Sequence, residues 1–380
     1  MLLFLSSVFN GISIGSVLLL AALGLAIVLG LMGVINLAHG ELIMLGAYTT
    51  YVVQNGFALL GEGWLEFYIF AALPAAFLVA ALVGLVLERG VIRHLYGRPL
   101  ETLLATWGIS LILRQFVRSV SWNFAIAMGL FCLLFFGSQW LLRRYTQWEN
   151  IRKQAIGVLL VLAGGIAITT GVGLQGQEIL AQPWFGAQNV DVTAPTWLRG
   201  GLPVGNFQLP YARLFIIGLT VICVVGIYWF LNRSSWGLRI RSVTQNRSMS
   251  ACLGIPTAKV DALTFAMGSG LAGIAGCAIT LLGSVGPNVG VNYIVDTFMV
   301  VVVGGVGKIV GSVVAALLIG TLNYLVGSGV LSLVFADWQA IADFFSFFAT
   351  TSMAKVMVFA LIIAFLQVRP AGLFPQKGRS

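Results

Sequence analysis

The side chains that most often carry chemistry in enzymes are sparse in this sequence of 380 residues. Its two histidines, His39 and His94, stand far apart, and no His-Glu-x-x-His pattern places two imidazoles on one helix face to bind zinc. The four cysteines lack the short spacing that metal sites use. No serine nucleophile motif or set of paired acidic residues indicates hydrolysis. The sequence therefore predicts no catalytic residue, no metal site and no enzyme activity.

One glycine-rich segment, GGVGK at 304–308, is similar to part of a nucleotide-binding loop. A P-loop has the pattern Gly-x-x-x-x-Gly-Lys-Ser/Thr, in which backbone N–H groups bind phosphate and the hydroxyl binds magnesium. Here Val302 takes the place of the first glycine and Ile309 the place of the hydroxyl residue. We therefore predict that this chain binds neither ATP nor another cofactor. The segment is better interpreted as a tight turn between two apolar stretches, with Lys308 at the membrane interface.

Six polar side chains lie inside or beside long apolar stretches, in two groups. Burying such side chains in a membrane costs free energy unless they are paired or hydrated. They could join helices or line a path for a polar substrate, and the sequence leaves both roles open. The first group falls in 33–41, which we interpret as a loop or a break in a helix. The two groups are Asn36, His39 and Glu41, and Asn288, Asn292 and Asp296.

Composition indicates which elements must position these groups. Hydrophobic residues make up 59% of the chain and charged residues 9%, whereas about a quarter of the residues of a soluble domain are charged. A spanning helix needs about 20 mostly apolar residues. We therefore predict an all-α, polytopic membrane helix bundle with about eleven spans, and no nucleic-acid binding despite the net charge of +9. The apolar stretches are 8–31, 40–56, 68–88, 101–118, 123–142, 155–174, 212–231, 261–283, 290–307, 309–330 and 355–368.

The positions of lysine and arginine predict how the chain is oriented in the membrane. No basic residue precedes Arg89, and loops rich in basic residues stay in the cytoplasm. With the N-terminus outside and the spans alternating, all but five of the 21 basic residues fall on the cytoplasmic side. The opposite orientation reverses this ratio, so we predict an external N-terminus and a cytoplasmic C-terminus. The five exceptions are Arg114, Arg118, Arg199, Arg213 and Lys355.

A polar segment at 232–260 falls on the predicted cytoplasmic side. Asn246 can accept hydrogen bonds at the start of a short helix, Gly254 suits the left-handed residue that ends one, and Pro256 prevents its continuation. We therefore expect a short amphipathic helix between two spans. It could rest on anionic lipid or insert into a groove of a cytosolic partner, and these residues alone favour the lipid.

Three longer segments are GVINLAHGELIMLGAY (33–48), NRSMSACLGIPTAKVDALTFAMGSGLAGIAG (246–276) and VVVGGVGKIVGSVVAALLIG (301–320). They resemble signatures of the permease subunits of branched-chain amino acid type ABC transporters. The match covers most of the chain in the same order and leaves aside about 120–175. Within this family the sequence is most similar to the urea-transport branch, through SVTQNRSMSACLGIP, VDTFMVVVVGGVGKIVG and NVDVTAPTWL.

The resemblance implies a multi-pass permease subunit of an ATP-driven urea importer in the cell inner (plasma) membrane, surrounded by lipid. It implies two cytosolic ATPase subunits that carry the ATP, a second permease subunit in a heterodimer, and an external substrate-binding protein. In such permeases the polar loop before the Gly-Ile-Pro turn docks on the ATPase, and that role falls here on 239–256. The coupling residues it implies are Arg239, Arg241, Asn246, Ser250, Leu253, Gly254 and Ile255.

We expect one permease domain over 1–380, with one departure from the usual family length. Residues 121–175 are interpreted as an inserted helical hairpin, which leaves the topology on both sides unchanged because it adds two spans. Residues 175–211 form a long external loop rich in Pro, Gly and Trp. This loop is either a structured cap over the bundle or a docking surface for a substrate-delivery protein.

Two other functions remain open. Within the same class, the substrate could be a branched-chain amino acid or a short amide, and the amino acid would require groups that satisfy an ammonium and a carboxylate. Urea is neutral and polar, so its path requires amide-like donors and acceptors instead. A different class, a secondary transporter or channel, predicts transport without an ATPase and inverted repeats with broken helices. No convincing repeat is visible in the sequence.

Overall fold

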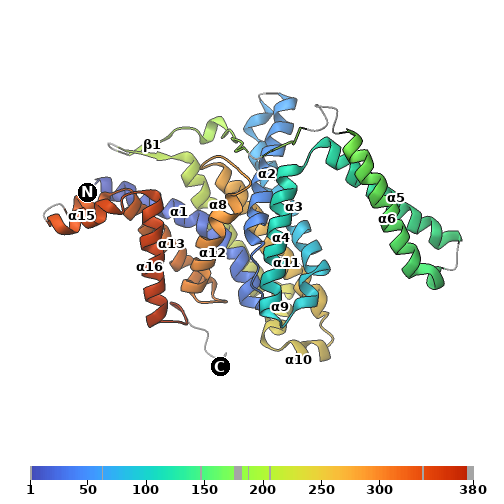
Figure 1. Ribbon diagram of the computed structural model, residues 1–380. Coiled ribbons are helices and arrows are strands. Elements are labelled where there is room, and N and C mark those ends of the chain that lie inside the picture. The colour runs from blue at the N-terminus through green and yellow to red at the C-terminus, as the bar shows by residue number, and fades with distance from the viewer. Residues whose placement is uncertain are drawn as a thin grey trace. The chain divides into compact units, whose positions relative to one another are not determined.

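The computed structural model describes residues 2–61, 63–145, 148–174, 182–186, 188–204, 207–335 and 338–374. Within them the chain is almost entirely helical, with one two-stranded sheet (Figure 1). The long helices are α1 (Leu2–Ile27), α2 (His39–Leu60), α3 (Tyr68–Gly90), α4 (Pro99–Ser119), α5 (Trp122–Tyr145), α6 (Trp148–Leu174), α8 (Tyr211–Arg233), α11 (Thr257–Thr280), α12 (Val289–Gly304), α13 (Ile309–Gly327) and α16 (Thr351–Val368). The shorter elements are α9 (Ser235–Gln245), α10 (Arg247–Cys252), α14 (Val330–Val334), α15 (Gln339–Phe347), a π-helical turn (Val28–Met32), three 3₁₀ turns (Trp64–Glu66, Ile92–Leu95, Thr196–Leu198) and the strands β1 (Gly201–Val204) and β2 (Phe207–Pro210).

Each of the eleven predicted apolar stretches coincides with one of the long helices, which agrees with a polytopic helix bundle. The stretch 8–31 continues through the π-helical turn, and 261–283, 290–307 and 309–330 each extend three residues beyond the end of their helix. Among the described residues, seven helices are long and apolar enough to cross a membrane. An eighth span results if α15 and α16, which bend by 111° at their junction, act as one. Three of the long helices fall short of a span. Helix α2 carries polar residues such as Gln54 and Asn55, and the apolar parts of α6 (Gly157–Gly173) and α12 are shorter than the roughly 20 residues of a full span. The number of spans and the orientation stay predictions.

The chain divides into two compact units. The first comprises Met1–Leu111 and Asn189–Ser380 and contains most of the long helices. The second, Ile112–Gln188, contains α5 and α6, which pack along each other as a hairpin. This hairpin corresponds to the segment that we interpret as an insertion, 121–175.

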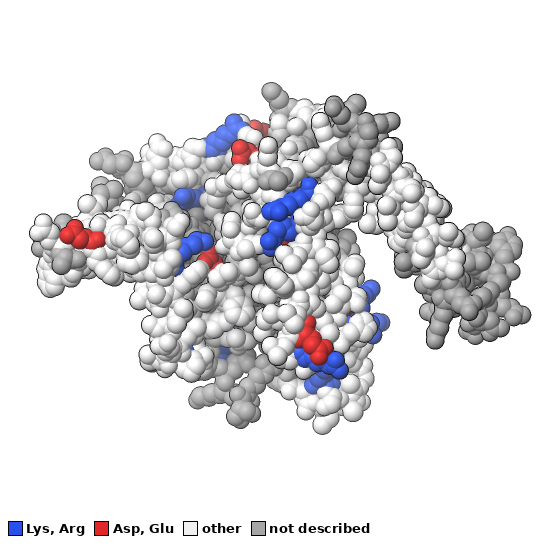
Figure 2. All heavy atoms as spheres, in the orientation of Figure 1, with Lys and Arg blue, Asp and Glu red and all other residues white. Residues whose placement is uncertain are grey.

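Helix α3 shows how a helix with no polar face can still have two different sides. Small residues at a spacing of four are buried against the neighbouring helices, whereas large apolar residues at the same spacing are exposed. In lipid this pattern is expected, because small residues allow helices to approach closely and large ones are solvated by acyl chains. Figure 2 shows that few charged side chains lie on the visible face of the described residues. The buried set is Ala72, Ala76, Ala80 and Gly84, and the exposed set is Leu78, Leu82 and Val86.

Helix α11 packs against α1, α2 and α3 in the core of the first unit. A Cβ atom at Gly273 of α11 would collide with the carbonyl of Ala76 on α3, and one at Gly46 of α2 would collide with the Gly273 backbone. The three backbones are thus too close for larger side chains at these points. Because closely packed helices cannot slide past one another freely, α11 and its neighbours form a rigid core.

Between α1 and α2 the chain leaves α-helical geometry, as predicted for 33–41. The π-helical turn ends at Gly33, whose φ of 67° is left-handed, and α2 begins only at His39. In the break, the side-chain oxygen of Asn36 accepts a hydrogen bond from the backbone N–H of Ala38 at 3.0 Å. Asn36 is buried in protein, which is the condition under which non-helical backbone is tolerated at membrane depth.

The described part of the predicted external loop, 175–211, is structured. Its strands β1 and β2 pair antiparallel. The indole of Trp197 donates a hydrogen bond to the backbone carbonyl of Glu66 at 2.9 Å and stacks on Phe70 of α3, with ring centroids 5.8 Å apart. These contacts favour the interpretation as a cap. In Figure 1 the loop lies near the top of the first unit and α9 and α10 lie near its bottom. Residues 175–181, 187 and 205–206 lie outside the described part of the chain.

Candidate functional site

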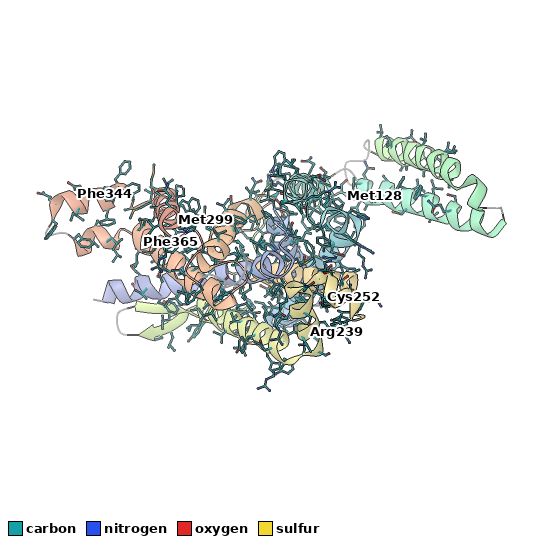
Figure 3. The ribbon with its side chains drawn as sticks, turned by 90° about the horizontal axis from the view of Figure 1, so that it is seen from below. Met128, Arg239, Cys252, Met299, Phe344 and Phe365 are labelled. Carbon is teal, nitrogen blue, oxygen red and sulfur yellow. The ribbon has the colours of Figure 1, made fainter. Side chains whose placement is uncertain are left out.

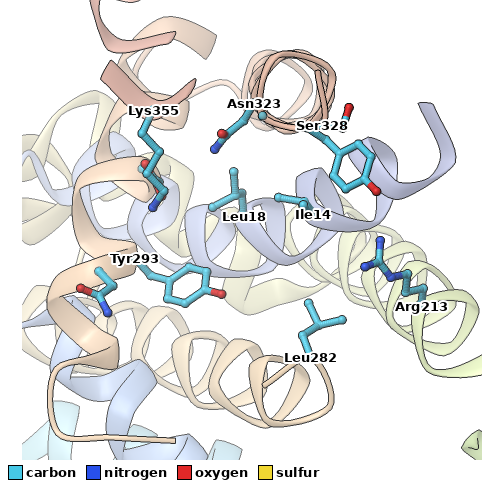
Figure 4. A pocket seen from close by; sticks show the side chains of 12 residues that line it. Ile14, Leu18, Arg213, Leu282, Tyr293, Asn323, Ser328 and Lys355 are labelled. Carbon is cyan, nitrogen blue, oxygen red and sulfur yellow. The ribbon is translucent and has the colours of Figure 1, made fainter. Parts of the chain in front are cut away.

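A cavity of about 740 Å³ opens between α1, α8, α12, α13 and α16 of the first unit (Figure 4). Apolar side chains such as Ile14, Leu18 and Leu282 line part of it. Its polar lining comes from segments far apart in the sequence, and in Figure 4 several of these side chains point toward the same space. The polar lining residues are Arg213, Asn292, Tyr293, Asp296, Asn323, Tyr324, Ser328 and Lys355.

An ion pair stands at one side of this cavity. The Nζ atom of Lys355 on α16 lies 2.8 Å from an Oδ atom of Asp296 on α12. Asp296 is buried and Lys355 is partly exposed. Since an isolated buried carboxylate is costly, the lysine stabilises the charge of Asp296. The pair presents no net charge to the cavity.

A series of hydrogen bonds that starts at Arg213 of α8 is the second polar feature of the cavity. The guanidinium of Arg213 donates to the side-chain oxygen of Asn10 at 2.6 Å, and the Asn10 amide nitrogen donates to the Tyr324 hydroxyl at 2.9 Å. The partner of Arg213 is thus a neutral amide, whereas the partner of Lys355 is a carboxylate. A fixed guanidinium with donors still available is a suitable partner for a carbonyl or carboxylate oxygen.

The cavity therefore offers two kinds of recognition. Amide and hydroxyl groups of residues such as Asn292, Asn323 and Tyr293 can donate to and accept from a neutral polar solute. A zwitterion could place its carboxylate near Arg213, but its ammonium would have to compete with Lys355 for Asp296. Binding a neutral solute requires no such exchange.

The structure separates the six polar residues that the sequence groups as a possible path. Asn292 and Asp296 line the cavity, and Asn288 lies exposed at the N-cap of α12. The remaining three are buried inside the protein and do not line this cavity. They are Asn36, His39 and Glu41.

The contacts of His39 and Glu41 are those of helix packing. A ring nitrogen of His39 lies 3.0 Å from the carbonyl oxygen of Ala21 on α1, and Ser110 on α4 donates to Glu41 at 2.9 Å. Each contact joins α2 to a different helix. The geometry therefore favours the packing role among the two that the sequence leaves open.

Sequence reasoning did not assign Arg213 and Lys355 to the path, although a signal for both exists. They are two of the five basic residues that fall outside the predicted cytoplasmic loops. A basic residue at such a position needs a counter-charge or a polar cavity. The structure supplies one for each.

The segment with the predicted coupling role folds as two short helices. The Ser234 hydroxyl caps α9 by accepting from the N–H of Gly237 at 2.9 Å, and the Asn246 side chain caps α10 by accepting from Met249 N at 3.0 Å. Only one short helix was expected, so α9 is new. The predicted start of a helix at Asn246 is confirmed.

The end of α10 is a Schellman motif. The N–H of Ile255 donates to Ser250 O at 3.0 Å, and the N–H of Gly254 donates to Ala251 O at 3.1 Å. Gly254 has a φ of 79°, as this motif requires. The predicted left-handed helix stop is confirmed.

The segment with the predicted coupling role exposes apolar side chains. Met249 is 58% exposed and Leu253 is 75% exposed, whereas Ser250 is buried and Ile255 packs on the main hydrophobic core. Figure 3 shows Arg239 and Cys252 on this segment. Arg239 stacks on the Trp236 ring at 4.9 Å, and both Arg239 and Arg241 are exposed.

The glycine-rich segment 304–308 is the predicted tight turn. It joins α12 to α13, and Gly305 and Gly307 have positive φ values of 98° and 89°. Lys308 is the N-cap residue of α13. Within the described part of the chain, no group of three or more His, Cys, Asp or Glu side chains could hold a metal ion.

Comparisons with known proteins point to one family. Residues 7–366 match the family described as "Branched-chain amino acid transport system / permease component". The high-affinity branched-chain amino acid transport system permease protein LivH of Escherichia coli K12 is 25% identical over 376 residues, which cover 98% of this chain and 96% of that protein. The corresponding permease BraD of Pseudomonas aeruginosa is 24% identical over 372 residues, covering 97% and 95%. The ribose import permease protein RbsC of Bacillus subtilis is 29% identical over 131 residues, covering 31% and 40%. No solved structure matches this chain.

Proposed function

This chain belongs to the family of permease components of branched-chain amino acid transport systems, and from that premise we propose that it is the membrane subunit of an ATP-driven importer of urea. The match over 7–366 carries the transport assignment, because it includes both the cavity and the coupling segment. The substrate assignment depends on the composition of the cavity and on the resemblance of several segments to the urea-transport branch.

The partners follow from the proposed role. Two cytosolic ATPase subunits supply the energy, one beneath this chain and one beneath a second permease subunit that completes a heterodimer. A substrate-binding protein delivers urea on the external side. The exposed apolar residues Met249 and Leu253 support the ATPase contact, because such side chains at the end of a short helix are suited to a groove on a partner. This chain itself binds no nucleotide.

The mechanism is alternating access. Closure of the ATPase subunits on ATP pushes α9 and α10, and the helices swing between an outward-open and an inward-open arrangement around the substrate. This requires a ligand that binds the two arrangements in turn without being held tightly by either. A small neutral solute that makes a few hydrogen bonds meets this requirement.

The paired charges of the cavity support urea as the substrate. Asp296 is already neutralised by Lys355 at 2.8 Å, so urea can bind nearby amides and hydroxyls without displacing either charge. Its carbonyl oxygen is a suitable acceptor for Arg213, and its two amino groups suit acceptors such as the Asn292 and Asn323 side-chain oxygens.

The function of relatives such as LivH and BraD favours a second candidate substrate, a branched-chain amino acid. Its carboxylate would bind near Arg213, and its side chain would contact Ile14, Leu18 and Leu282. Its ammonium would have to take the place of Lys355 beside Asp296. Because breaking that pair costs free energy, this candidate predicts that the pair opens when substrate binds.

Substrate-stimulated ATP hydrolysis distinguishes these candidates. The experiment assembles this chain in nanodiscs with the second permease, the ATPase subunits and the binding protein that co-purify with it. We expect urea and short amides to stimulate hydrolysis and leucine to have no effect. Stimulation by leucine alone would establish the second candidate, and failure of any ATPase subunit to co-purify would favour a secondary transporter or channel.

A further inference from the structure

Helix α10 has little apolar surface with which to anchor itself. Its six residues include one that is buried, Ser250, while Met249 and Cys252 are exposed. So short a helix depends for its stability on its caps and on contacts with other elements. Something other than hydrophobic burial must hold it against the bundle if a push on its surface is to move the spans.

The side chain of Arg247, the first residue of α10, makes two contacts beyond its own helix. Its guanidinium lies 2.6 Å from an Oδ atom of Asp261 in the first turns of α11. It also lies over the ring of Tyr96, 4.8 Å from the ring centroid. Asp261 is only 6% exposed and Arg247 is 49% exposed. The arginine is therefore the counter-charge of the buried Asp261 carboxylate.

Tyr96 is itself fixed to a third helix. Its hydroxyl donates to Glu88 near the end of α3 at 3.2 Å, and Glu88 is buried. Burial, together with the nearby carboxylates of Asp261 and Glu88, raises the pKa of the Tyr96 hydroxyl, so it stays protonated and remains a donor. A planar guanidinium can stack on an aromatic ring and pair with a carboxylate at once, which a lysine does less well.

The two ends of these contacts lie on helices that are closely packed together. A Cβ atom at Gly84 of α3 would collide with the side chain of Ser269 on α11, and the same pair meets again at Ala76 and Gly273. A displacement applied to either helix is therefore shared by both. Asp261 and Glu88 are attachment points on one rigid body.

We propose that Arg247 is a positioning residue that transmits movement of α10 to the α3–α11 pair through Asp261 and Tyr96. The proposal rests on the proposed function, because it takes α10 as the surface that the ATPase pushes. Without Arg247, α10 still folds from its own cap and Schellman motif, but its motion is no longer passed to the spans.

The first test measures the motion of α10 in the permease alone. A spin label is placed on exposed Cys252 after the other cysteines (Cys132, Cys223 and Cys277) are replaced by alanine. We expect the label to become more mobile in Arg247→Met and in Asp261→Asn, and no more mobile in the double variant than in either single one. Arg247→Lys keeps the charge and should be intermediate. Arg233→Met, which removes an exposed arginine at the end of α8, should match the wild type.

Equal mobility in Arg247→Met and the wild type would overturn the proposal, as would additive effects in the double variant. The second test measures urea transported per ATP hydrolysed in the assembled complex. A loss of roughly fivefold is expected for Arg247→Met, within the range that side-chain networks carry. ATPase binding should be unchanged.

The double variant separates transmission from stability. Replacing Asp261 removes the unpaired buried charge that Arg247→Met leaves behind, so the double variant should regain thermal stability. It should not regain coupling. Full coupling in either variant would contradict the proposal. Failure of the wild-type permease to assemble with ATPase subunits would instead contradict the proposed function, and the spin-label result would stand independently.

Discussion

At the scale of residues, two buried carboxylates share one arrangement. Asp296 and Asp261 are both almost fully buried, and each lies beside one basic side chain that is partly exposed. An ion pair with one exposed partner can open at lower cost than one that is entirely buried, because water solvates the released cation. Such pairs suit a protein whose helices must move. One pair lines the cavity and the other connects α10 to the bundle.

Removing Lys355 should alter both stability and selectivity. In Lys355→Met, Asp296 loses its counter-charge, and we expect the free energy of unfolding to fall by about 1–2 kcal/mol, less than for a fully buried pair because the lysine is partly exposed. The free carboxylate can then accept an ammonium, so leucine should inhibit urea uptake more strongly than in the wild type. Thermal denaturation and competition assays measure the two effects. Asp296→Asn in the same chain should restore stability and abolish the leucine effect; an unchanged leucine effect would show that Asp296 does not contact substrate.

The two histidines offer a matched comparison of packing with solvation. His39 is fully buried with a ring nitrogen 3.0 Å from Ala21 O, whereas His94 is exposed. We expect His39→Ala to lower the free energy of unfolding by about 2–4 kcal/mol through the lost contact and the cavity it leaves. The apparent KM for urea of the folded protein should not change. His94→Ala is the control and should behave as the wild type. A raised KM at normal stability in His39→Ala would return His39 to the substrate path.

At the scale of elements, the positions of the long helices can be predicted from the sequence, whereas the way these helices pack against one another cannot. Long apolar stretches identify spans because a chain in lipid must satisfy its backbone within each helix. Asn246 and Gly254 identify the ends of α10 because caps depend on local chemistry. Short helices such as α14 and α15 carry no comparable signal, since tertiary packing stabilises them. Lys355 and Asp296 are 59 residues apart in the sequence, and local patterns do not predict that they form an ion pair, because the pair depends on how the helices pack.

Substitutions of Gly254 test whether the Schellman motif that ends α10 is needed for coupling. No atom lies within 4 Å of a Cβ at this position, so its φ of 79°, and not a lack of space, disfavours other residues. A β-branched residue is strongly disfavoured in this region, whereas asparagine tolerates it. We expect Gly254→Val to insert normally but to lower urea transported per ATP severalfold, and Gly254→Asn to retain most coupling. Transport and hydrolysis measured together check this. Full coupling in the valine variant would show that the Schellman motif is dispensable.

At the scale of the whole molecule, the structured loop and the helices α9 and α10 lie at different ends of the first unit (Figure 1). The same division follows from the basic residues of the sequence, which concentrate around α9 and α10 and are scarce in 175–211. An importer needs these two surfaces on opposite sides of the membrane. One surface receives the substrate, and the other is moved when the ATPase subunits close.

This division predicts which sites are accessible from each side. A peptide tag inserted within 185–205 should react with an impermeant reagent added to intact cells, and a reporter fused after Ser380 should be active only in the cytoplasm. Both follow from an external N-terminus and an odd number of spans. A tag that reacts only after the cells are lysed would refute the orientation.

ATP-driven uptake of labelled urea is the most direct test of the proposed function. Proteoliposomes would contain this chain with its second permease and ATPase subunits, with the binding protein outside and ATP inside. We predict accumulation of urea that requires both ATP and the binding protein and that excess leucine does not reduce. A complex with a hydrolysis-deficient ATPase should show none. Uptake of leucine in place of urea, or urea entry that is independent of ATP, would contradict the assignment.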